Sequence, residues 1–517
     1  MKMEILNSFA VFLGVVIFLL GACRVLDWVW LKPKKLEKHL KRQGLNGNSY
    51  KFLFGDMKEM RDMFIEASSK PLSFSDDIVS KVFPHFQETI KKHGENSFFW
   101  AGPKPSVLIM DPDLIKEVTV KYLSYTKLHS NPLIQLLAKG LVRYEGNKWA
   151  KHRKIINPAF HQDKLKLMTP AFHTSANEVL VKWEEIVSTK GSSELDVWPS
   201  LQTLTRYAIS RTAFGFDYEE GRKIFELQSE QARHFMNALW TVYIPGWRFV
   251  PTKSNRRMKE IAKYVDSSLL SIVDARMKAI KAGKAKEDDL LNLFLKSSSK
   301  EIDLGGSKDY GFSMEDVIEE CKLFYFAGQE TIAALLVWTM ITLSRHQEWQ
   351  NRAREEVLNL FGTNEPDFDG LNQLKIVPMI LYEVLRLYPP ISLLNRETVE
   401  EIKLGNITLP AGVQVDLPLM LLNYDSKLWG DDVNEFNPER FAGGTAAGTK
   451  GKVVFFPFGW GPRYCLGQNF AMLEAKLVLV MILQRFSFEL SPTYTHSPAP
   501  IVTLQPQHGA HLILHKL

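Results

Sequence analysis

The stretch FFPFGWGPRYCLGQNF at residues 455–470 restricts the fold most, because it sets one cysteine between a glycine-rich turn and a long helical run. Gly459 and Gly461 allow the backbone to turn tightly and to approach another group closely. Cys465 then precedes a run without proline that extends to residue 486. The dipole and free N–H groups of a helix N-terminus favour a thiolate. These features favour a thiolate at residue 465, whereas a buried structural cysteine is the usual explanation for an isolated cysteine.

The composition is that of a folded globular protein in a reducing compartment. Of 517 residues, 45% are hydrophobic and 24% are charged. The three cysteines, at positions 23, 321 and 465, are too few for a disulfide framework, and their spacing does not fit a zinc site. A net charge of +6, without a basic block interleaved with aromatic residues, argues against nucleic acid as a partner.

The N-terminus has the pattern of a membrane anchor. Residues 5–23 carry no charge, apolar residues continue to Leu31, and the basic segment KPKKLEKHLKR follows. About 20 apolar residues suffice to cross a bilayer, and the following positive charges predict a cytosolic location for the rest of the chain. A cleaved signal peptide is the alternative, but its apolar core would be shorter. We expect a transmembrane signal anchor at 1–31, a basic linker at 32–50 and a single catalytic domain at 51–517.

Helical patterns dominate the catalytic part, so the fold class predicted is mostly α with minor β. The expected helices lie at 258–282, 313–346, 371–388 and 466–486, and the expected short strands lie at 106–110, 402–412 and 501–514. The Ser-, Gly- and Lys-rich segment 297–311 is predicted as a surface loop. The segment FAGGTAAGTKGK at 441–452 is predicted as a flexible loop rather than a phosphate-binding loop, because no Ser or Thr follows its lysine. Asn406 begins the sequon NIT and is predicted to lie in a surface turn.

The whole pattern FxxGxRxCxG is present as Phe458, Gly461, Arg463, Cys465 and Gly467. It resembles the haem-binding loop of the cytochrome P-450 superfamily, whose haem iron is held by a cysteine thiolate. The resemblance implies the cytochrome P-450 fold, haem b (iron protoporphyrin IX) as cofactor and Cys465 as the iron ligand. Phe458, Arg463 and Gly467 would then contact the haem.

Two further segments fit the same family as structural elements. YEVLRLYPP contains Glu383 and Arg386 three residues apart, which alone would be a weak surface ion pair on a helix. The resemblance implies instead a buried cluster completed by Arg440 of FNPERF, structural rather than catalytic.

The helix predicted at 313–346 contains AGQET, residues 327–331, in its middle. Ser313 and Asp316 have the spacing of a capping box at its start. A glycine there has no obvious packing purpose and costs about 1 kcal/mol relative to alanine. The resemblance implies a helix distortion beside the oxygen-binding face of the haem, with Thr331 and Glu330 as catalytic proton-transfer residues. The alternative for Thr331 is a hydrogen bond to the carbonyl one turn earlier.

The resemblance also assigns contacts to the haem propionates. Trp149 and Arg153 of GNKWAKHRK are spaced i,i+4 on a helix and would reach one propionate; Arg396 would bind the other together with Arg463. Lys148, Lys151, His152 and Lys154 lie beside them in the sequence. They form either a solvated helix face or a docking patch for an acidic electron donor.

Longer phrases, such as EECKLFYFAGQET and ILYEVLRLYPP, are similar to a plant microsomal group of terpenoid oxidases that includes secologanin synthase. The resemblance implies an NADPH-dependent monooxygenase of iridoids, triterpenoids or gibberellins. It would be single-pass in the endoplasmic reticulum membrane, with a cytosolic catalytic domain and NADPH–cytochrome P-450 reductase as partner; NADPH and flavins would act only through that reductase. Substrate contacts are expected from 105–135, 225–250, the helix face before Ala327, 391–395 and 499–504. Hydroperoxide rearrangement without a reductase and a non-catalytic haem sensor are the alternatives.

Overall fold

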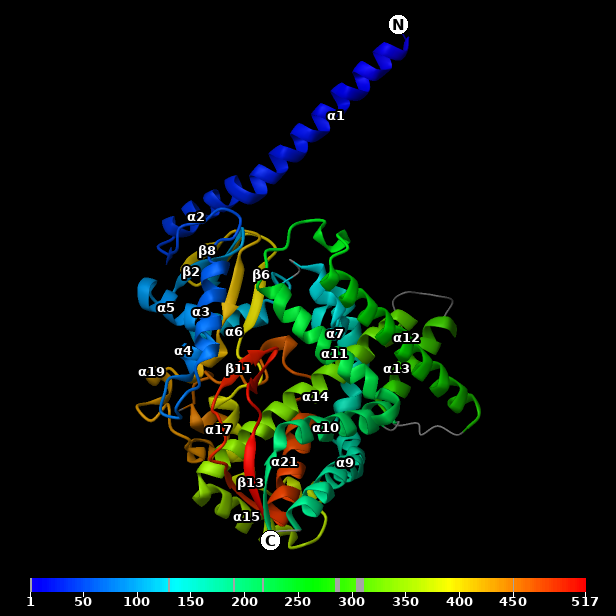
Figure 1. Cartoon of the computed structure of the whole chain (residues 1–517), viewed down its shortest axis with the longest axis vertical. Coiled ribbons are helices and arrows are strands. Elements are labelled where there is room, and N and C mark those ends of the chain that lie inside the picture. The colour runs from blue at the N-terminus through cyan, green and yellow to red at the C-terminus, as the bar shows by residue number, and fades with distance from the viewer. Residues whose placement is uncertain are drawn as a thin grey trace.

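A helical region and a smaller region built around a sheet lie side by side in the body of the molecule (Figure 1). The computed structural model of the protein describes residues 2–128, 131–188, 191–215, 218–283, 289–303, 311–449 and 451–517. The mostly α fold with minor β that the sequence predicts is confirmed.

The long helices gather around α14 (Met314–Arg345), whose residues from Ile332 to Leu343 are all buried. The predicted capping box starts this helix: Ser313 Oγ accepts a hydrogen bond from Asp316 N at 3.1 Å, and Asp316 Oδ2 accepts one from Ser313 N at 3.1 Å. The helices around it include α8 (Gly146–Ile156), α9 (Gln162–Ser188), α10 (Val197–Ile209), α11 (Tyr218–Leu239), α12 (Lys253–Lys281), α13 (Leu290–Asp303), α15 (Gln347–Phe361), α17 (Ile376–Leu387) and α21 (Gln468–Arg485). α10 packs along α14, and α21 packs against both α9 and α14.

The main sheet has six strands in the order β1-β2-β3-β9-β6-β4. Their bounds are β1 (Asn46–Gly47), β2 (Ser97–Ala101), β3 (Lys104–Leu108), β9 (Gln414–Leu417), β6 (Leu394–Thr398) and β4 (Tyr125–Thr126). β9 runs parallel to β3 and antiparallel to β6, with Arg396 opposite Val415. This register fixes the position of Arg396 along the sheet.

Three small sheets complete the β structure. β10 (Phe486–Leu490), β13 (His511–Lys516) and β5 (Ser192–Asp196) form one; β11 (Pro498–Ile501) and β12 (Thr503–Pro506) form another; β7 (Ile402–Leu404) and β8 (Ile407–Leu409) form the third. Asn406 lies in the exposed turn of the β7–β8 hairpin, as expected. β11 and β12 are joined by one residue, Val502; β12 lies against α14, and β11 lies against α4 (Ile78–Val82) and α11.

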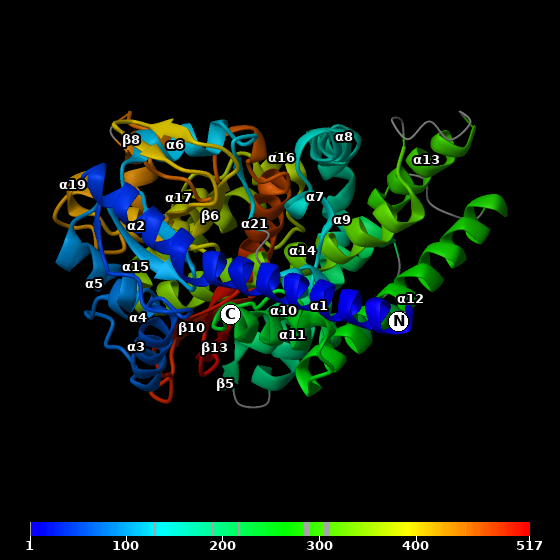
Figure 2. The same cartoon turned by 90° about the horizontal axis from the view of Figure 1, so that it is seen from above.

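The N-terminal helix α1 (Lys2–Leu26) projects from the body and crosses above it (Figures 1 and 2). A short π-helical turn (Asp27–Leu31) leads into α2 (Lys32–Arg42). No residue in the apolar stretch of this helical segment is buried. The other described helix that is long and apolar enough to cross a membrane, α14, is mostly buried. The segment expected as a basic linker packs Leu36 and Leu40 of α2 into the core beside the sheet. The domain bounds proposed at residues 31 and 50 stay a prediction.

Three predicted elements differ from the structure. The helix expected at 371–388 begins only at Ile376, where the Glu356 carboxylate accepts hydrogen bonds from the N–H groups of residues 375, 376 and 377. Part of the loop expected at 297–311 is helical, since α13 continues to Asp303; residues 304–310 lie outside the described part. The loop expected at 441–452 contains a short helix, α20 (Thr445–Gly448), and residue 450 lies outside the described part.

Candidate active site

A cavity of about 320 Å³ lies between α14 and the loop that precedes α21. Apart from Glu330, every residue predicted to act in catalysis, bind the cofactor or hold the metal lines it: Trp149, Arg153, Thr331, Arg396, Phe458, Arg463, Cys465 and Gly467. Four separate parts of the chain thus meet here: α8, α14, β6 and the segment 458–467.

The turn before α21 holds Cys465 at the edge of the cavity. Gly459 has φ 76° and Gly461 has φ 70°, so both need the conformational freedom of glycine. A Cβ on Gly461 would also lie 2.9 Å from Thr119 O. Cys465 N donates to Phe458 O at 2.8 Å, which closes the loop. The predicted role of the two glycines in the turn is confirmed.

Cys465 is exposed and lines the cavity. The protein around it desolvates the sulfur and raises its pKa, while the Gly467 N–H and the charge of Arg153 act in the opposite direction. The N–H of Gly467, the N-cap of α21, thus favours the thiolate as expected, but desolvation of the sulfur outweighs this effect. A coordinating metal ion deprotonates a thiol outright, so an iron bound here would convert the Cys465 thiol to a thiolate.

Three arginines bring positive charge to one side of the cavity. Arg153 Nη1 donates to Tyr464 O at 3.0 Å, and Arg396 Nη1 donates to Asn395 O at 2.8 Å. Arg463 donates to Tyr144 O at 2.7 Å and pairs with Glu145. The centre of the Arg463 guanidinium also lies 4.7 Å from the centroid of the Trp149 ring, so Trp149 acts as a platform for this cation.

The arginine cluster lacks enough anions of its own. Burial, together with the charge of Arg463, lowers the pKa of Arg396 to about 10. Within the described part of the chain, Arg153 Nη2, Arg396 Nε and Arg463 Nε are buried without a hydrogen-bond partner. Buried cations are tolerated when carboxylates pair with them. The residues present therefore fit the two propionates of a haem whose iron would face Cys465.

Sequence reasoning missed Lys127, a fourth cation in the cavity lining. Desolvation, together with the charges of Arg396 and Arg463, lowers the pKa of Lys127 well below its ordinary value. Glu145 is the counter-charge: its carboxylate accepts a hydrogen bond from Lys127 N at 2.9 Å and pairs with Arg463. No local pattern marks Lys127, because it follows the short edge strand β4 rather than a helix.

Thr331 reaches the cavity from an undistorted helix. The described residues 327–331 are continuously α-helical, so the expected distortion is absent there. Thr331 Oγ1 donates to Ala327 O at 2.9 Å, the alternative that the sequence left open. Its oxygen can still accept a hydrogen bond from a group in the cavity.

Gly328 has a packing purpose that the sequence did not reveal. A Cβ at this position would lie 2.7 Å from Ile209 Cδ1 of α10. The glycine thus permits the close approach of α10 to α14, and the expectation that it had no packing role is wrong.

Glu330 lies on the flank of α14, away from the described lining of the cavity. Its side chain is 5% exposed and is held by two amides, Gln505 Nε2 at 2.8 Å and Gln329 Nε2 at 3.1 Å. Desolvation raises the pKa of Glu330 to about 7, against the opposing charge of Arg206. A carboxyl group that titrates near neutrality suits proton transfer.

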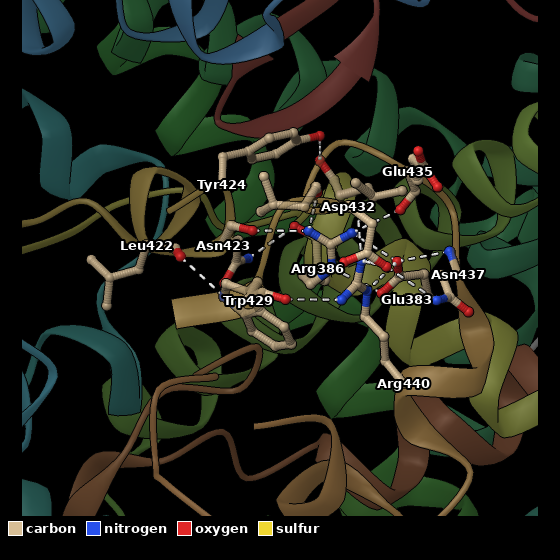
Figure 3. Close-up of polar contacts among 12 residues, drawn as sticks. Glu383, Arg386, Leu422, Asn423, Tyr424, Trp429, Asp432, Glu435, Asn437 and Arg440 are labelled. Atoms are coloured by element: carbon tan, nitrogen blue, oxygen red, sulfur yellow. Dashed lines mark hydrogen bonds and ion pairs between the residues drawn. The ribbon is translucent and has the colours of Figure 1, made fainter. Parts of the chain in front are cut away.

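The structure brings Glu383, Arg386 and Arg440 together as predicted (Figure 3). Arg386 makes a bidentate contact with Glu383 at 2.7 and 2.8 Å, and Arg440 Nε lies 3.4 Å from Glu383 Oε1. Arg386 also donates to the carbonyls of residues 423, 433 and 435, and Arg440 to those of 429 and 432. The cluster thus joins α17 to the segment 423–440, which precedes the Cys465 loop in the sequence.

The basic segment on α8 is not one uniform surface. His152 is buried, with its Nδ1 2.6 Å from Glu320 Oε1, and Lys148 Nζ pairs with Asp316 Oδ1 at 2.7 Å. Lys154 is exposed and Lys151 is partly exposed. Placing His152 in the docking patch was wrong.

Three of the stretches expected to contact substrate contribute to the cavity lining: Lys127 from 105–135, Leu323 and Phe324 before Ala327, and Ile391 with Leu394 from 391–395. Residues 129–130 of the first stretch lie outside the described part. Among the described residues of 225–250 and 499–504, none lines the cavity.

Comparison with known proteins agrees with this geometry. A family model described as cytochrome P450 matches residues 76–513. Cytochrome P450 CYP72A219 of Panax ginseng is 59% identical, covering 99% of both chains, and cytochrome P450 72A397 of Kalopanax septemlobus is 57% identical, covering 96% of this chain and 95% of its own. The solved structure of retinoic acid bound cyanobacterial CYP120A1 superposes with a TM-score of 0.74 at 21% identity, covering 92% of this chain and 99% of its own, and shows the fold.

Proposed function

Since the chain belongs to the cytochrome P450 family and is a haem-dependent monooxygenase, we propose that it inserts one oxygen atom from O2 into a C–H bond of a hydrophobic plant terpenoid. Iridoids, triterpenoids and gibberellins are the candidate substrates. Plant relatives at 57–59% identity and the apolar side chains in the cavity support this class. The observation that carries the proposal is one cavity in which a thiol, a cluster of cations and an apolar helix face meet.

Haem b is the cofactor of this family, and it supplies the activation of oxygen and its insertion into the substrate. In this proposal the Cys465 sulfur would bind the haem iron, Phe458 would pack beside it and the Gly467 N–H would tune the sulfur. Arg153, Arg396 and Arg463 would hold the propionates through donors that are otherwise unpaired.

The substrate is held chiefly by burial of apolar surface. Leu323, Phe324 and Leu335 of α14 line the cavity together with Ile391 and Leu394. Each such side chain that is covered contributes about 1.5–3 kcal/mol of hydrophobic free energy. This lining selects an apolar molecule and keeps water from the reacting bond.

Thr331 and Glu330 deliver protons to the cavity in this proposal. The Thr331 hydroxyl lies at the cavity wall and can accept a proton while passing its own onward. The Glu330 carboxyl, whose pKa is about 7, donates to Thr331 directly or through water and is recharged from solvent.

We place the enzyme in the endoplasmic reticulum membrane, anchored once by α1, with NADPH–cytochrome P-450 reductase as electron donor. The exposed apolar helix near the N-terminus and the basic residues of α2 support this placement. The exposed Lys154 of α8, beside Arg153 of the cavity, supports docking of an acidic donor on this side.

One assay tests the function against its two alternatives. Microsomes that contain the enzyme and reductase should consume oxygen in an NADPH-dependent manner with iridoid, triterpenoid or gibberellin pools and form hydroxylated products. Turnover of a hydroperoxide without NADPH would instead identify a rearranging enzyme. A complete lack of turnover with every pool would favour a haem sensor.

A further inference from the structure

The Glu330 carboxylate is fixed by a residue far away in the chain. Gln505 Nε2 of β12 donates to Glu330 Oε2 at 2.8 Å, across 175 residues of sequence. Gln329 Nε2 donates to the other oxygen at 3.1 Å. Successive residues of an α-helix point about 100° apart, so a carboxylate held here stays apart from the Thr331 hydroxyl at the cavity wall.

The same amide of Gln505 also organises the tip of its own hairpin. Its Nε2 donates to Thr503 Oγ1 at 2.9 Å and lies 3.3 Å from Ile501 O. Between these residues Val502 has φ 63°, a conformation that a β-branched residue rarely adopts. Such strain persists only where surrounding contacts enforce it.

The hairpin is anchored at one point and exposed at another. Leu504 N donates to Pro390 O at 3.1 Å, and Leu504 O accepts from Trp338 Nε1 of α14 at 2.8 Å. Pro390 lines the cavity, whereas Ile501 at the tip is 36% exposed. A molecule in the cavity that displaces Pro390 would therefore also displace Leu504, and with it Gln505, relative to α14.

The electrostatic surroundings of Glu330 make the Gln505 amide important. The charged group that faces the carboxylate from a neighbouring element is Arg206 of α10, while Gln329 and Gln505 provide neutral donors. Hydrogen bonds to a carboxylate favour its charged form, whereas desolvation opposes it. Loss of the Gln505 amide would thus favour the protonated carboxyl and release it to rotate.

We propose that Gln505 is a positioning residue that holds Glu330 away from the cavity and releases it when bound substrate, through Pro390, displaces the β11–β12 hairpin. The released carboxyl turns toward Thr331, transfers its proton to the hydroxyl oxygen while that hydroxyl passes its own proton into the cavity, and is reprotonated from solvent. Proton delivery then depends on an occupied cavity. This inference rests on the proposed relay role of Glu330 and Thr331.

The test compares wild type with Q505L and with Q507L as a matched control. Gln507 lies just beyond the same strand, and its Oε1 accepts from Ser497 Oγ at 2.7 Å rather than contacting Glu330. Infrared difference titration against E330Q reports the protonated Glu330 carboxyl independently of turnover. We expect the apparent pKa of Glu330 to rise by about one unit in Q505L, since a hydrogen bond to a charged group is lost. Q507L should titrate like wild type.

Activity provides the second readout. NADPH oxidation without substrate should rise several-fold in Q505L, because Glu330 is no longer restrained in the empty cavity. Should Q505L fail to fold, Q505N keeps the amide on a side chain one methylene shorter and should show the same two changes. An unchanged titration and unchanged substrate-free oxidation in folded Q505L or Q505N would overturn the inference.

The E330Q variant distinguishes a failure of this inference from a failure of the proton relay through Glu330 and Thr331 on which it rests. If E330Q couples NADPH use to product as well as wild type, the relay itself is wrong. If E330Q uncouples while the Gln505 variants behave like Q507L, the relay stands and only the role of Gln505 is rejected.

Discussion

His152 Nδ1 lies 2.6 Å from Glu320 Oε1, and the two side chains are 1% and 0% exposed. This pair joins α8, which carries Trp149 and Arg153, to α14, which carries Thr331. The second oxygen of Glu320 accepts from Leu141 N at 3.1 Å, and Leu141 lines the cavity. One buried carboxylate therefore fixes α8, which carries Arg153, relative to α14, which carries Thr331.

Glu320→Ala should destabilise the protein and loosen α8. The substitution leaves the buried His152 ring and Leu141 N–H without their acceptor, so we expect the free energy of unfolding to fall by about 3 kcal/mol. Denaturant unfolding and the fraction of protein that retains haem measure the two effects. Glu315→Ala on the same helix is the control, because Glu315 is 79% exposed and its 3.8 Å contact with Lys139 should contribute under about 1 kcal/mol. Equal losses in both variants would contradict the role assigned to Glu320.

Cys465→Ser should remove the absorption band that the reduced, carbon monoxide-bound haem thiolate gives. The hydroxyl is a poor substitute for the sulfur as a ligand, although it occupies nearly the same space. Cys23→Ser changes an exposed thiol outside the cavity and should leave the band intact. Survival of the band in Cys465→Ser would reject residue 465 as the iron ligand.

Patterns that act over a few residues were predictable from the sequence. The loop at 458–467 and the Ser313 capping box have fixed spacings, and the structure places their residues as expected. The long apolar helices were also predictable, because their periodicity survives packing. The start of α17 was missed because its N-terminal N–H groups are capped by Glu356, about 20 residues earlier.

Contacts between distant segments could not be predicted. Gly328 is explained only by Ile209 on another helix, and His152 by a partner 168 residues away. The position of His152 carried a usable signal, since a residue three places after buried Trp149 shares its helix face. No sequence signal marked Lys127 or Gln505, because their contacts depend on how the sheet edges lie against α14 and the cavity.

Thr331→Ala should uncouple NADPH oxidation from product formation. The variant loses the hydroxyl at the cavity wall, so proton delivery slows. We expect the amount of product formed per NADPH consumed to fall about tenfold. Thr331→Ser keeps the hydroxyl and should restore most of the coupling. Thr339→Ala is a matched control, because Thr339 Oγ1 makes the same kind of bond to Leu335 O at 2.7 Å but lies outside the cavity lining. Full coupling in Thr331→Ala would remove this residue from the relay.

Glu383→Ala should be among the most destabilising substitutions in the chain. It leaves Arg386 uncompensated at 0% exposure and removes the acceptor of Asn437 N, so we expect a loss of about 3–5 kcal/mol. Glu439→Ala removes an ion pair of similar length, 2.7 Å to Arg352, in which both side chains are about half exposed. That control should cost less than about 1 kcal/mol. Similar unfolding temperatures for the two variants would show that the cluster of Glu383, Arg386 and Arg440 does not stabilise the fold.

Glu330→Gln should change how stability depends on pH. The folded-state pKa of Glu330 is about 7, above the ordinary value of 4.5, so the folded protein binds more protons than the unfolded chain between these values. Stability from this group is therefore fully present below pH 4.5 and is lost as pH rises to 7, by about 3 kcal/mol at 1.36 kcal/mol per pKa unit. The glutamine side chain does not titrate. The free energy of unfolding of the variant should therefore rise relative to wild type by that amount between pH 4.5 and 7, and the difference between the two proteins should stay constant above pH 8. Denaturant midpoints of both proteins at several pH values measure the gain, with Glu348→Gln, a 65% exposed residue, as control. A wild-type-like pH profile in Glu330→Gln would mean that the carboxyl is ionised at its ordinary pKa, which would remove the basis for its role as a proton donor near neutrality.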